Sequence, residues 1–264
     1  MRLRRREVGR SLILTLNDKA RQNALSAEMV VELARALDAA PEGLAALVIE
    51  GANGVFSAGA DLKSLSEALA APLAPGATDP LESLSVAGGR FFARFAALPY
   101  VTIAVVDGAA IGGGMGLACA SDVVIATARA RFALAETTLG FPPAQIAPYL
   151  VARLGERIAK RLALTGARVE GREAAALGLA DYYCEGEREA AAKVEALIVS
   201  IERCAPEANA ETKRLFSLAR LMARDAYIET AATSFAAALR GEEGREGLAA
   251  FREKRAPNWA RAAK

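Results

Sequence analysis

Histidine is absent from the 264 residues of this chain. Without an imidazole group, a Ser-His-Asp triad and a zinc protease of the HExxH type are both excluded. Any proton transfer must therefore fall to carboxylates, tyrosine, lysine or cysteine.

Cysteine is scarce as well. The three cysteines, Cys119, Cys184 and Cys204, are odd in number, far apart and without CxxC spacing. This pattern argues against a disulfide framework and against a zinc site. We therefore expect no bound metal and interpret all three cysteines as core residues.

Long apolar runs and a strong net charge are also missing. No stretch approaches the roughly 18 apolar residues of a membrane helix, and the N-terminal region lacks a secretory signal. The formal net charge of +2 is too small to attract nucleic acid electrostatically. RLRRR at residues 2–6 is interpreted as the exposed edge of a strand, with a phosphate-binding arm as the alternative. We expect a soluble, cytoplasmic protein with no nucleic-acid and no membrane partner.

The hydrophobic fraction of 53% is enough for a sizeable core, in one large domain or one domain with an appendage. Within residues 10–17, SLILTLN predicts a strand that pairs with a preceding strand in a hairpin. Ser26 is typical of an N-cap, and Pro41 with Gly43 closes the helix that follows. Further strands are expected at 44–50, 101–107 and 123–126, with a helix from Ala118 between the last two. This order indicates β-α-β units and an α/β fold.

The second half of the sequence is richer in helix patterns. Residues 73–80, which include Pro75, predict a surface loop between two helices. From Pro148 onward the chain is expected to be almost wholly helical, with apolar side chains on one helix face at Val194, Leu197, Ile198 and Ile201. The terminal helices could cover their own core or pack on a neighbouring subunit, and periodicity does not decide between these.

A glycine cluster follows the strand expected at 101–107. Residues 108–117 read GAAIGGGMGL, although each glycine inside an element costs roughly 0.5–1 kcal/mol relative to alanine. Neither GxxxxGK[ST] nor GxGxxG is present, which argues against a nucleotide site. The remaining physical reason is a helix start whose free N–H groups face a ligand. A second loop, GANGVFSAGADL at 51–62, has the same character, so two N–H groups could converge on one oxygen as an oxyanion hole.

These two stretches resemble the signature loops of the crotonase, or enoyl-CoA hydratase/isomerase, superfamily. The matching runs are FSAGADLK at 56–63 and AVVDGAAIGGGMGLACASDVVIA at 104–126, with RFALAETTLGFPPAQIAPYL at 131–150, LALTGARVEGREAAALGLAD at 162–181 and EGLAAFREKRAPNW at 246–259 continuing the likeness. The resemblance implies a β-β-α spiral core over residues 1–200 and a helical trimerisation region over 201–264. It further implies a homotrimer or a dimer of trimers, an acyl-CoA thioester substrate, and no cofactor beyond the CoA of the substrate.

The resemblance also assigns site residues. It implies that the N–H groups of Ala60 and Gly113 hold the thioester oxygen, and that Glu136 is a catalytic carboxylate. It assigns CoA contacts to Ala58, Ala60, Asp61, Leu62, Gly112 and Gly113, and places Phe251 and Lys254 near a CoA bound to a neighbouring subunit.

One position departs from the family pattern. Hydratases of this family generally carry two catalytic glutamates, and the first of these positions is Gly116 here, whereas the second is Glu136. A single carboxylate suffices for a 3,2-enoyl-CoA isomerase, or for a hydration in which Glu136 acts alone or another group orients the water. Gln145 is the candidate for positioning that water, with Asp61 and Glu67 as weaker candidates. We expect burial to raise the pKa of Glu136; without the resemblance, it would be interpreted as an N-cap or a surface carboxylate.

Hydration of a 2-enoyl-CoA is therefore the first functional hypothesis and isomerisation the second. A non-catalytic CoA-binding protein and an RNA-binding relative are the remaining alternatives. The run PPAQIAPYL at 142–150 resembles that of isohexenylglutaconyl-CoA hydratases of acyclic terpene breakdown.

Overall fold

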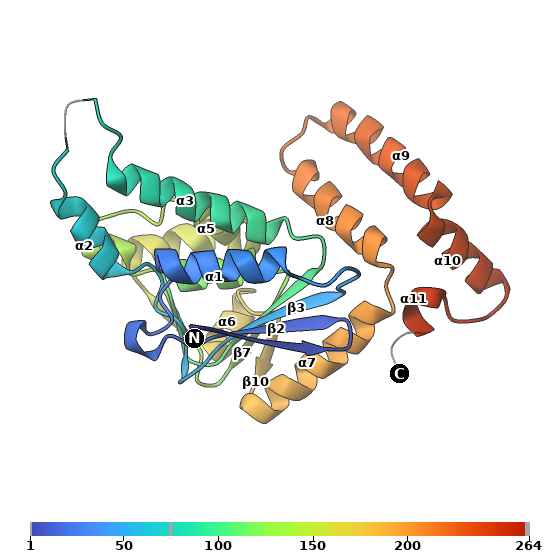
Figure 1. The fold of residues 1–264 in the computed structure, drawn as a ribbon, viewed down its shortest axis with the longest axis horizontal. Coiled ribbons are helices and arrows are strands. Elements are labelled where there is room, and N and C mark those ends of the chain that lie inside the picture. The colour runs from blue at the N-terminus through green and yellow to red at the C-terminus, as the bar shows by residue number, and fades with distance from the viewer. Residues whose placement is uncertain (1, 74–75, 262–264) are drawn as a thin grey trace.

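Two β-sheets with covering helices build the molecule, and the computed structural model describes residues 2–73 and 76–261 (Figure 1). The α/β class predicted from the sequence is confirmed. The larger sheet has six strands in the spatial order β1 (Leu3–Val8), β2 (Ser11–Leu16), β3 (Ala46–Gly51), β5 (Val101–Val106), β7 (Val123–Thr127) and β10 (Tyr182–Cys184). Only the β1–β2 hairpin is antiparallel within this sheet.

The burial pattern of the β1–β2 hairpin explains why one of its two strands is rich in arginine. All residues of β2 except Thr15 are buried, as in a strand covered on both faces. β1 is the edge strand, and every residue after Leu3 is exposed. Arg4, Arg5 and Arg6 therefore lie on an exposed strand edge, as the sequence predicted.

A second, four-stranded sheet carries shorter strands. Its spatial order is β4 (Val55–Ser57), β6 (Ala109–Ile111), β8 (Arg131–Ala133) and β9 (Arg168–Glu170). The strands β4, β6 and β8 come directly after β3, β5 and β7, so the chain alternates between the two sheets before it enters helical structure. Three successive β-β-α turns result, which confirms the spiral that the resemblance implied.

Helices cover both faces of the larger sheet. On one face the side chains of α1, α3, α4 and α5 form the main core, and on the other face α7 packs over Ile13, Val48, Ile103 and Ile125 (Figure 1). The predicted apolar face of α7 is confirmed by its contacts in this second cluster. These elements are η1 (Lys19–Arg21), α1 (Ala27–Asp38), α2 (Leu62–Ala70), α3 (Pro80–Ala96), α4 (Gly113–Ala120), η2 (Glu136–Leu139), α5 (Ala147–Thr165), α6 (Gly171–Ala176) and α7 (Glu187–Glu202).

The C-terminal helices form an arm that extends away from the sheets (Figure 1). They are α8 (Pro206–Ala219), α9 (Arg224–Arg240), α10 (Glu242–Arg252) and α11 (Asn258–Arg261). Lys213 ties α8 to the core, because its Nζ donates to Asp122 Oδ2 at 2.6 Å and to the carbonyl oxygen of Tyr100 at 2.9 Å. The division of the chain after residue 200 stays a prediction. None of the described helices is long and apolar enough to cross a membrane.

Three expectations from the sequence were wrong. The helix expected from Ala118 begins at Gly113, because the glycines pack closely enough against β4 to offset their low helix propensity. Two strands, β9 and β10, follow Pro148, and each has three residues, too few for a periodic pattern. Cys204 is exposed, because α7 ends two residues before it, whereas Cys119 and Cys184 are buried as expected.

The loop expected at 73–80 connects α2 to α3, which begins at Pro80. Asp79 is the N-cap of α3, and its side chain accepts a hydrogen bond from the N–H of Leu81. Pro75 lies outside the described residues.

Candidate active site

Two loops meet at the start of helix α4. One leads from β4 toward α2, and the other leads from β6 into α4. A Cβ added to Gly59 would overlap the carbonyl oxygen of Ile111 and lie 3.0 Å from the nitrogen of Gly113, and a Cβ on Gly113 would lie 3.7 Å from the nitrogen of Ala60. The backbone N–H groups of Ala60 and Gly113 are therefore close neighbours, as the resemblance implied.

Glycine is required at this meeting point. Gly59 has φ +85°, which disfavours any side chain, and its N–H donates to Ser57 Oγ at 3.2 Å. Gly112 has φ +51°, and its N–H donates to the carbonyl oxygen of Ala133 at 2.8 Å. A Cβ on Gly114 would overlap the carbonyl oxygen of Ser57. Bare backbone thus lets α4 begin against β4 and the loop after it.

The N–H groups of Ala60 and Gly113 are available to a ligand. Gly113 is the first residue of α4, where an N–H has no intrahelical acceptor. Neither N–H donates a hydrogen bond to any residue that the structure describes. Both also lie at or beside the positive end of the helix dipole, which favours an oxygen that gains negative charge.

Glu136 faces this glycine turn. It follows β8 as the first residue of η2, and its Oε1 lies 2.6 Å from the position of a Cβ on Gly112. Its Oε2 is buried and finds no hydrogen-bond partner among the described residues. Burial raises the pKa of Glu136, and a backbone hydrogen bond only partly opposes this. The N-cap of η2 is Ala135, so Glu136 is neither a capping residue nor a solvated surface carboxylate.

No room exists for a second carboxylate at position 116. A Cβ on Gly116 would overlap Cγ2 of Ile146 and lie 2.7 Å from its Cβ. Ile146 is only 4% exposed and belongs to the main core. An isoleucine therefore fills the space that a glutamate at this position would need.

The candidates for a substitute partner are engaged elsewhere. Asp61 is the N-cap of α2, where it accepts hydrogen bonds from the Lys63 N–H at 3.2 Å and from Ser64 Oγ at 2.9 Å. Glu67 is exposed and pairs with Lys63. Gln145 donates from Nε2 to Ser85 Oγ at 3.0 Å, and its Oε1 lies against Gly89 of α3. The described contacts therefore do not place any of these three side chains on Glu136.

The remaining predicted contact residues are spread over two regions. Ala58 belongs to the loop before α2, where its N–H donates to the carbonyl oxygen of Gln22 at 3.0 Å. Leu62 is the first residue of α2 and is 51% exposed. Phe251 is 83% exposed on α10 and Lys254 follows that helix, so within one chain both belong to the C-terminal arm (Figure 1).

Sequence reasoning missed three supporting residues. Ile146 is one of them. Ser57 is fully buried and joins the site loop to the carbonyl oxygen of Asn23 at 2.8 Å. Arg153 donates to carbonyl oxygens at the C-terminal end of α4, those of Ser121 and Asp122 among them, and pairs with Asp181 at 3.1 Å. Ser57 could have been found from its place two residues before Gly59, but nothing local in the sequence marks Ile146 or Arg153.

Cys119 is not a proton carrier for this site. It lies near the C-terminal end of α4, and burial raises the pKa of its thiol to about 12. Glu136 is therefore the candidate proton-transfer group at the glycine turn.

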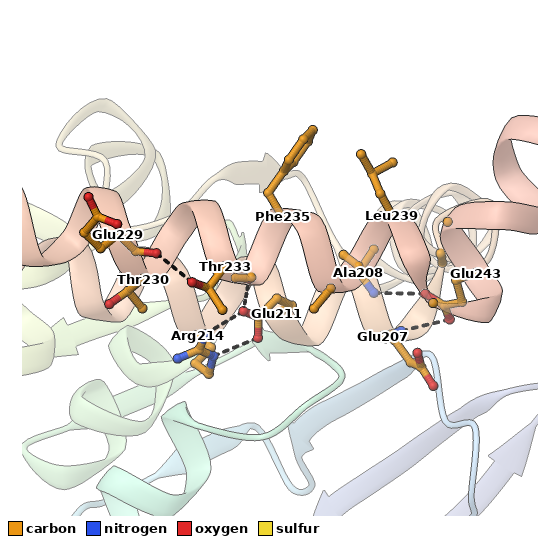
Figure 2. Close-up of a pocket in the computed structure, with 16 residues that line it drawn as sticks. Glu207, Ala208, Glu211, Arg214, Glu229, Thr230, Thr233, Phe235, Leu239 and Glu243 are labelled. Atoms are coloured by element: carbon orange, nitrogen blue, oxygen red, sulfur yellow. Dashed lines mark hydrogen bonds and ion pairs between the residues drawn. The ribbon is translucent and has the colours of Figure 1, made fainter.

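A hollow lies elsewhere, between α8 and the helices α9 and α10 (Figure 2). Three of its charged side chains are engaged, since Glu211 binds Arg214 at 2.6 Å and Glu243 accepts from the N–H groups of Glu207 and Ala208 at 3.0 Å. Phe235 and Leu239 of α9 are among the residues that line it (Figure 2). The hollow belongs to the C-terminal arm, and Glu136 is not among the residues that line it.

The β-β-α spiral, with its glycine turn and half-buried carboxylate, defines the class of protein: this is a crotonase fold. Residues 9–262 match the family model of enoyl-CoA hydratase/isomerase, and the chain belongs to that family.

Solved structures and curated relatives agree with this assignment. An enoyl-CoA hydratase/isomerase from Marinobacter aquaeolei has a TM-score of 0.92 at 39% identity, covering 98% of this chain and 99% of its own. Pseudomonas aeruginosa AtuE has a TM-score of 0.91 at 41% identity, covering 98% and 100%. The 2,3-dehydroadipyl-CoA hydratase of Escherichia coli is 30% identical over 253 residues, 95% of each chain. The likeness to isohexenylglutaconyl-CoA hydratases stays a prediction.

Proposed function

We propose that this protein hydrates a 2-enoyl-CoA thioester, with Glu136 as its single catalytic carboxylate. The observation that carries the proposal is the half-buried Glu136 side chain, whose buried Oε2 is unpartnered and which faces the glycine turn that presents two free N–H groups. The hydratase names of its relatives support the same reaction class.

The two N–H groups would act on the thioester oxygen. As the double bond reacts, negative charge moves onto this oxygen and the thioester becomes enolate-like. Each backbone donor of such a site typically contributes about 2.7–4 kcal/mol to the transition state. Ala60 and Gly113 supply these donors from a fixed backbone, so no reorganisation is needed as the charge develops.

Glu136 would then carry out both proton transfers of hydration. Its carboxylate removes a proton from water as the water oxygen bonds to C3, and the C2–C3 double-bond electrons move toward the thioester. The resulting carboxylic acid returns the proton to C2, which restores the carboxylate. A pKa raised by burial suits a group that must both accept and donate.

The second candidate function is 3,2-enoyl-CoA isomerisation, in which Glu136 moves one proton from C2 to C4. The specific observation in its favour is Ile146 over Gly116, because an apolar side chain there offers no hydrogen bond to a nucleophilic water. This reaction needs only one carboxylate and no water.

For substrate binding, we propose the loop of Ala58, Asp61 and Leu62 beside Gly112 as the CoA contact. Phe251 and Lys254 would reach the CoA of a neighbouring subunit in a homotrimer or a dimer of trimers. The exposed position of Phe251 in the single chain supports this arrangement. CoA enters as part of the substrate, and no separate cofactor is proposed.

The experiment is incubation with a 2-enoyl-CoA and with a 3-enoyl-CoA in heavy-oxygen water, followed by mass spectrometry. Label in a 3-hydroxyacyl-CoA product supports hydration. Bond migration without label supports isomerisation, and absence of both reactions contradicts an enoyl-CoA enzyme.

A further inference from the structure

Gly116 and Ile146 fit together as a pair. The Cγ2 branch of Ile146 occupies the position of a Cβ on residue 116, and its Cδ1 lies 3.4 Å from that position. Gly116 does not have a positive φ, so its backbone would accept other residues. The side chain of Ile146, and not backbone strain, is what restricts position 116 to glycine.

Ile146 has little freedom to move aside. A β-branched side chain is stiff about χ1, and Ile146 is the N-cap of α5. Its carbonyl oxygen accepts hydrogen bonds from the N–H groups of Tyr149 and Leu150, both at 3.1 Å. Pro143 and Pro148 lie within three residues on either side and restrict the backbone further. The side chain is thus held over Gly116 by its own chain.

The first turn of α4 leads from Ile146 to the candidate catalytic carboxylate. Gly112 is the N-cap of α4, and its carbonyl oxygen accepts a hydrogen bond from the N–H of Gly116 at 2.9 Å, so the two glycines lie one helical turn apart, about 5.4 Å. A Cβ on Gly112 would meet Glu136, and a Cβ on Gly116 would meet Ile146. Glu136 and Ile146 therefore lie against glycines one turn apart, and an aliphatic side chain cannot orient a water molecule by hydrogen bonding.

We propose that Ile146 is a specificity-determining residue, which sets how much of the chemistry at Glu136 ends in hydration and how much in double-bond migration. Because the Ile146 side chain fills the space over Gly116, a water molecule cannot occupy that position next to Glu136. A smaller side chain at 146 opens that position and raises the share of hydration. This inference rests on the function proposed above, since it concerns the same carboxylate.

The test compares Ile146→Ala with the wild-type protein on two esters of equal length, trans-2-hexenoyl-CoA and trans-3-hexenoyl-CoA. The measured quantity is kcat/KM for hydration divided by kcat/KM for isomerisation. We expect this quotient to rise about tenfold, the discrimination that one methylene in an apolar pocket commonly carries. Ile146→Val keeps a branch over Gly116 and should change the quotient less.

Leu150→Ala is the control for lost packing. Leu150 is 2% exposed in the same core, one turn further along α5, and is not among the atoms that meet Gly116. It should lose comparable stability and leave the quotient at the wild-type value. If Ile146→Ala and Leu150→Ala shift the quotient equally, or if neither shifts it, Ile146 does not set the reaction.

A second measurement tests the packing without activity. Gly116→Ala should lower the thermal midpoint strongly in the wild type and much less in the Ile146→Ala background, because the added methyl group then has space. Additive losses in the two variants would overturn the inference while leaving the proposed function intact. A wild-type protein that turns over neither ester would instead contradict the proposed function and, with it, this inference.

Discussion

At the residue scale, Oε2 of Glu136 is one of three buried side-chain oxygens without a hydrogen-bond partner among the described residues, and it belongs to a carboxylate. A carboxylate oxygen that is buried without a hydrogen-bond partner is unfavourable when ionised, and this cost is what raises the pKa of Glu136. The same group should therefore control turnover and weaken the fold.

Glu136→Gln should lower kcat about 10²–10⁴-fold, the usual contribution of a positioned acid–base group. Glutamine has nearly the same shape but exchanges no proton, so binding of a non-reactive acyl-CoA should change little. Steady-state kinetics and isothermal titration check the two parts. Wild-type turnover in this variant would remove Glu136 from the mechanism.

The stability of the same variant should depend on pH. Because burial raises the pKa of folded Glu136 above its ordinary value of 4.5, the wild-type protein loses stability as pH rises through the folded pKa. The glutamine side chain of the variant carries no charge to bury. Urea unfolding should show Glu136→Gln more stable than the wild type at neutral pH, with the difference shrinking as the pH falls through the folded pKa toward 4.5 and absent below that value. A difference that is independent of pH would contradict this account.

The sequence predicted some residues of this site and missed others for a physical reason. Gly112, Gly113 and Glu136 lie in sequence runs that can be recognised as site segments without knowledge of the fold. Ile146 acts on Gly116 across 30 positions of chain, and a single sequence holds no sign of that contact. Asp61 and Glu67 are engaged with Lys63 and Ser64, their neighbours on α2, and the sequence alone did not indicate these contacts.

At the element scale, helix α4 is held at both ends. Its first turn packs on β4 through glycine, and its last carbonyl groups accept hydrogen bonds from Arg153. The strands β2, β3, β5 and β7 were predictable because each is a short apolar run, whereas the start of α4 was not, because low helix propensity was offset by tertiary packing. Each end of α4 offers a test.

Gly59→Ala should lower kcat/KM about 10²–10³-fold, because its methyl group would press on the nitrogen of Gly113 and displace one donor. Gly54→Ala is the matched control: its φ of +71° is close to the +85° of Gly59, but its added methyl meets nothing within 4 Å. Both variants should lose about 1 kcal/mol of stability from the left-handed backbone, and Gly59→Ala should lose more, because its methyl group also overlaps the carbonyl oxygen of Ile111. Equal kinetic losses in the two would contradict a role for Gly59 at the donors.

Arg153→Ala should cost about 2–4 kcal/mol of unfolding free energy, because the carbonyl oxygens of Ser121 and Asp122 lose a charged donor in a largely buried place. Arg172 provides the comparison, since its pair with Glu185 is exposed and Arg172→Ala should cost less than about 1 kcal/mol. Urea unfolding measures both. Similar losses would mean that Arg153 does not hold the end of α4.

At the scale of the whole molecule, the C-terminal arm leaves large apolar side chains exposed in a single chain. Phe216, Leu221, Phe235 and Phe251 are 70%, 82%, 67% and 83% exposed. Apolar patches of this kind are typical of protein interfaces. Periodicity left open whether these helices cover their own core, and their exposed apolar side chains favour packing on a neighbouring subunit.

Sedimentation should therefore give a mass of three or six chains at micromolar concentration. Phe235→Glu should shift the protein toward single chains, because a charge would be buried in the interface. Arg188→Glu, on the exposed face of α7, is the control and should leave the mass unchanged. A wild-type protein that sediments as a single chain would contradict the oligomer.

The pair of Gly116 and Ile146 also fixes the order in which this sequence can evolve. A glutamate that arises at 116 meets the branch of Ile146 and disrupts the fold before it can help catalysis. Shrinking residue 146 first leaves only a cavity, at a cost of about 2–5 kcal/mol. Mutational paths to a second carboxylate at position 116 must therefore begin at position 146, so that this carboxylate cannot be gained by a single substitution.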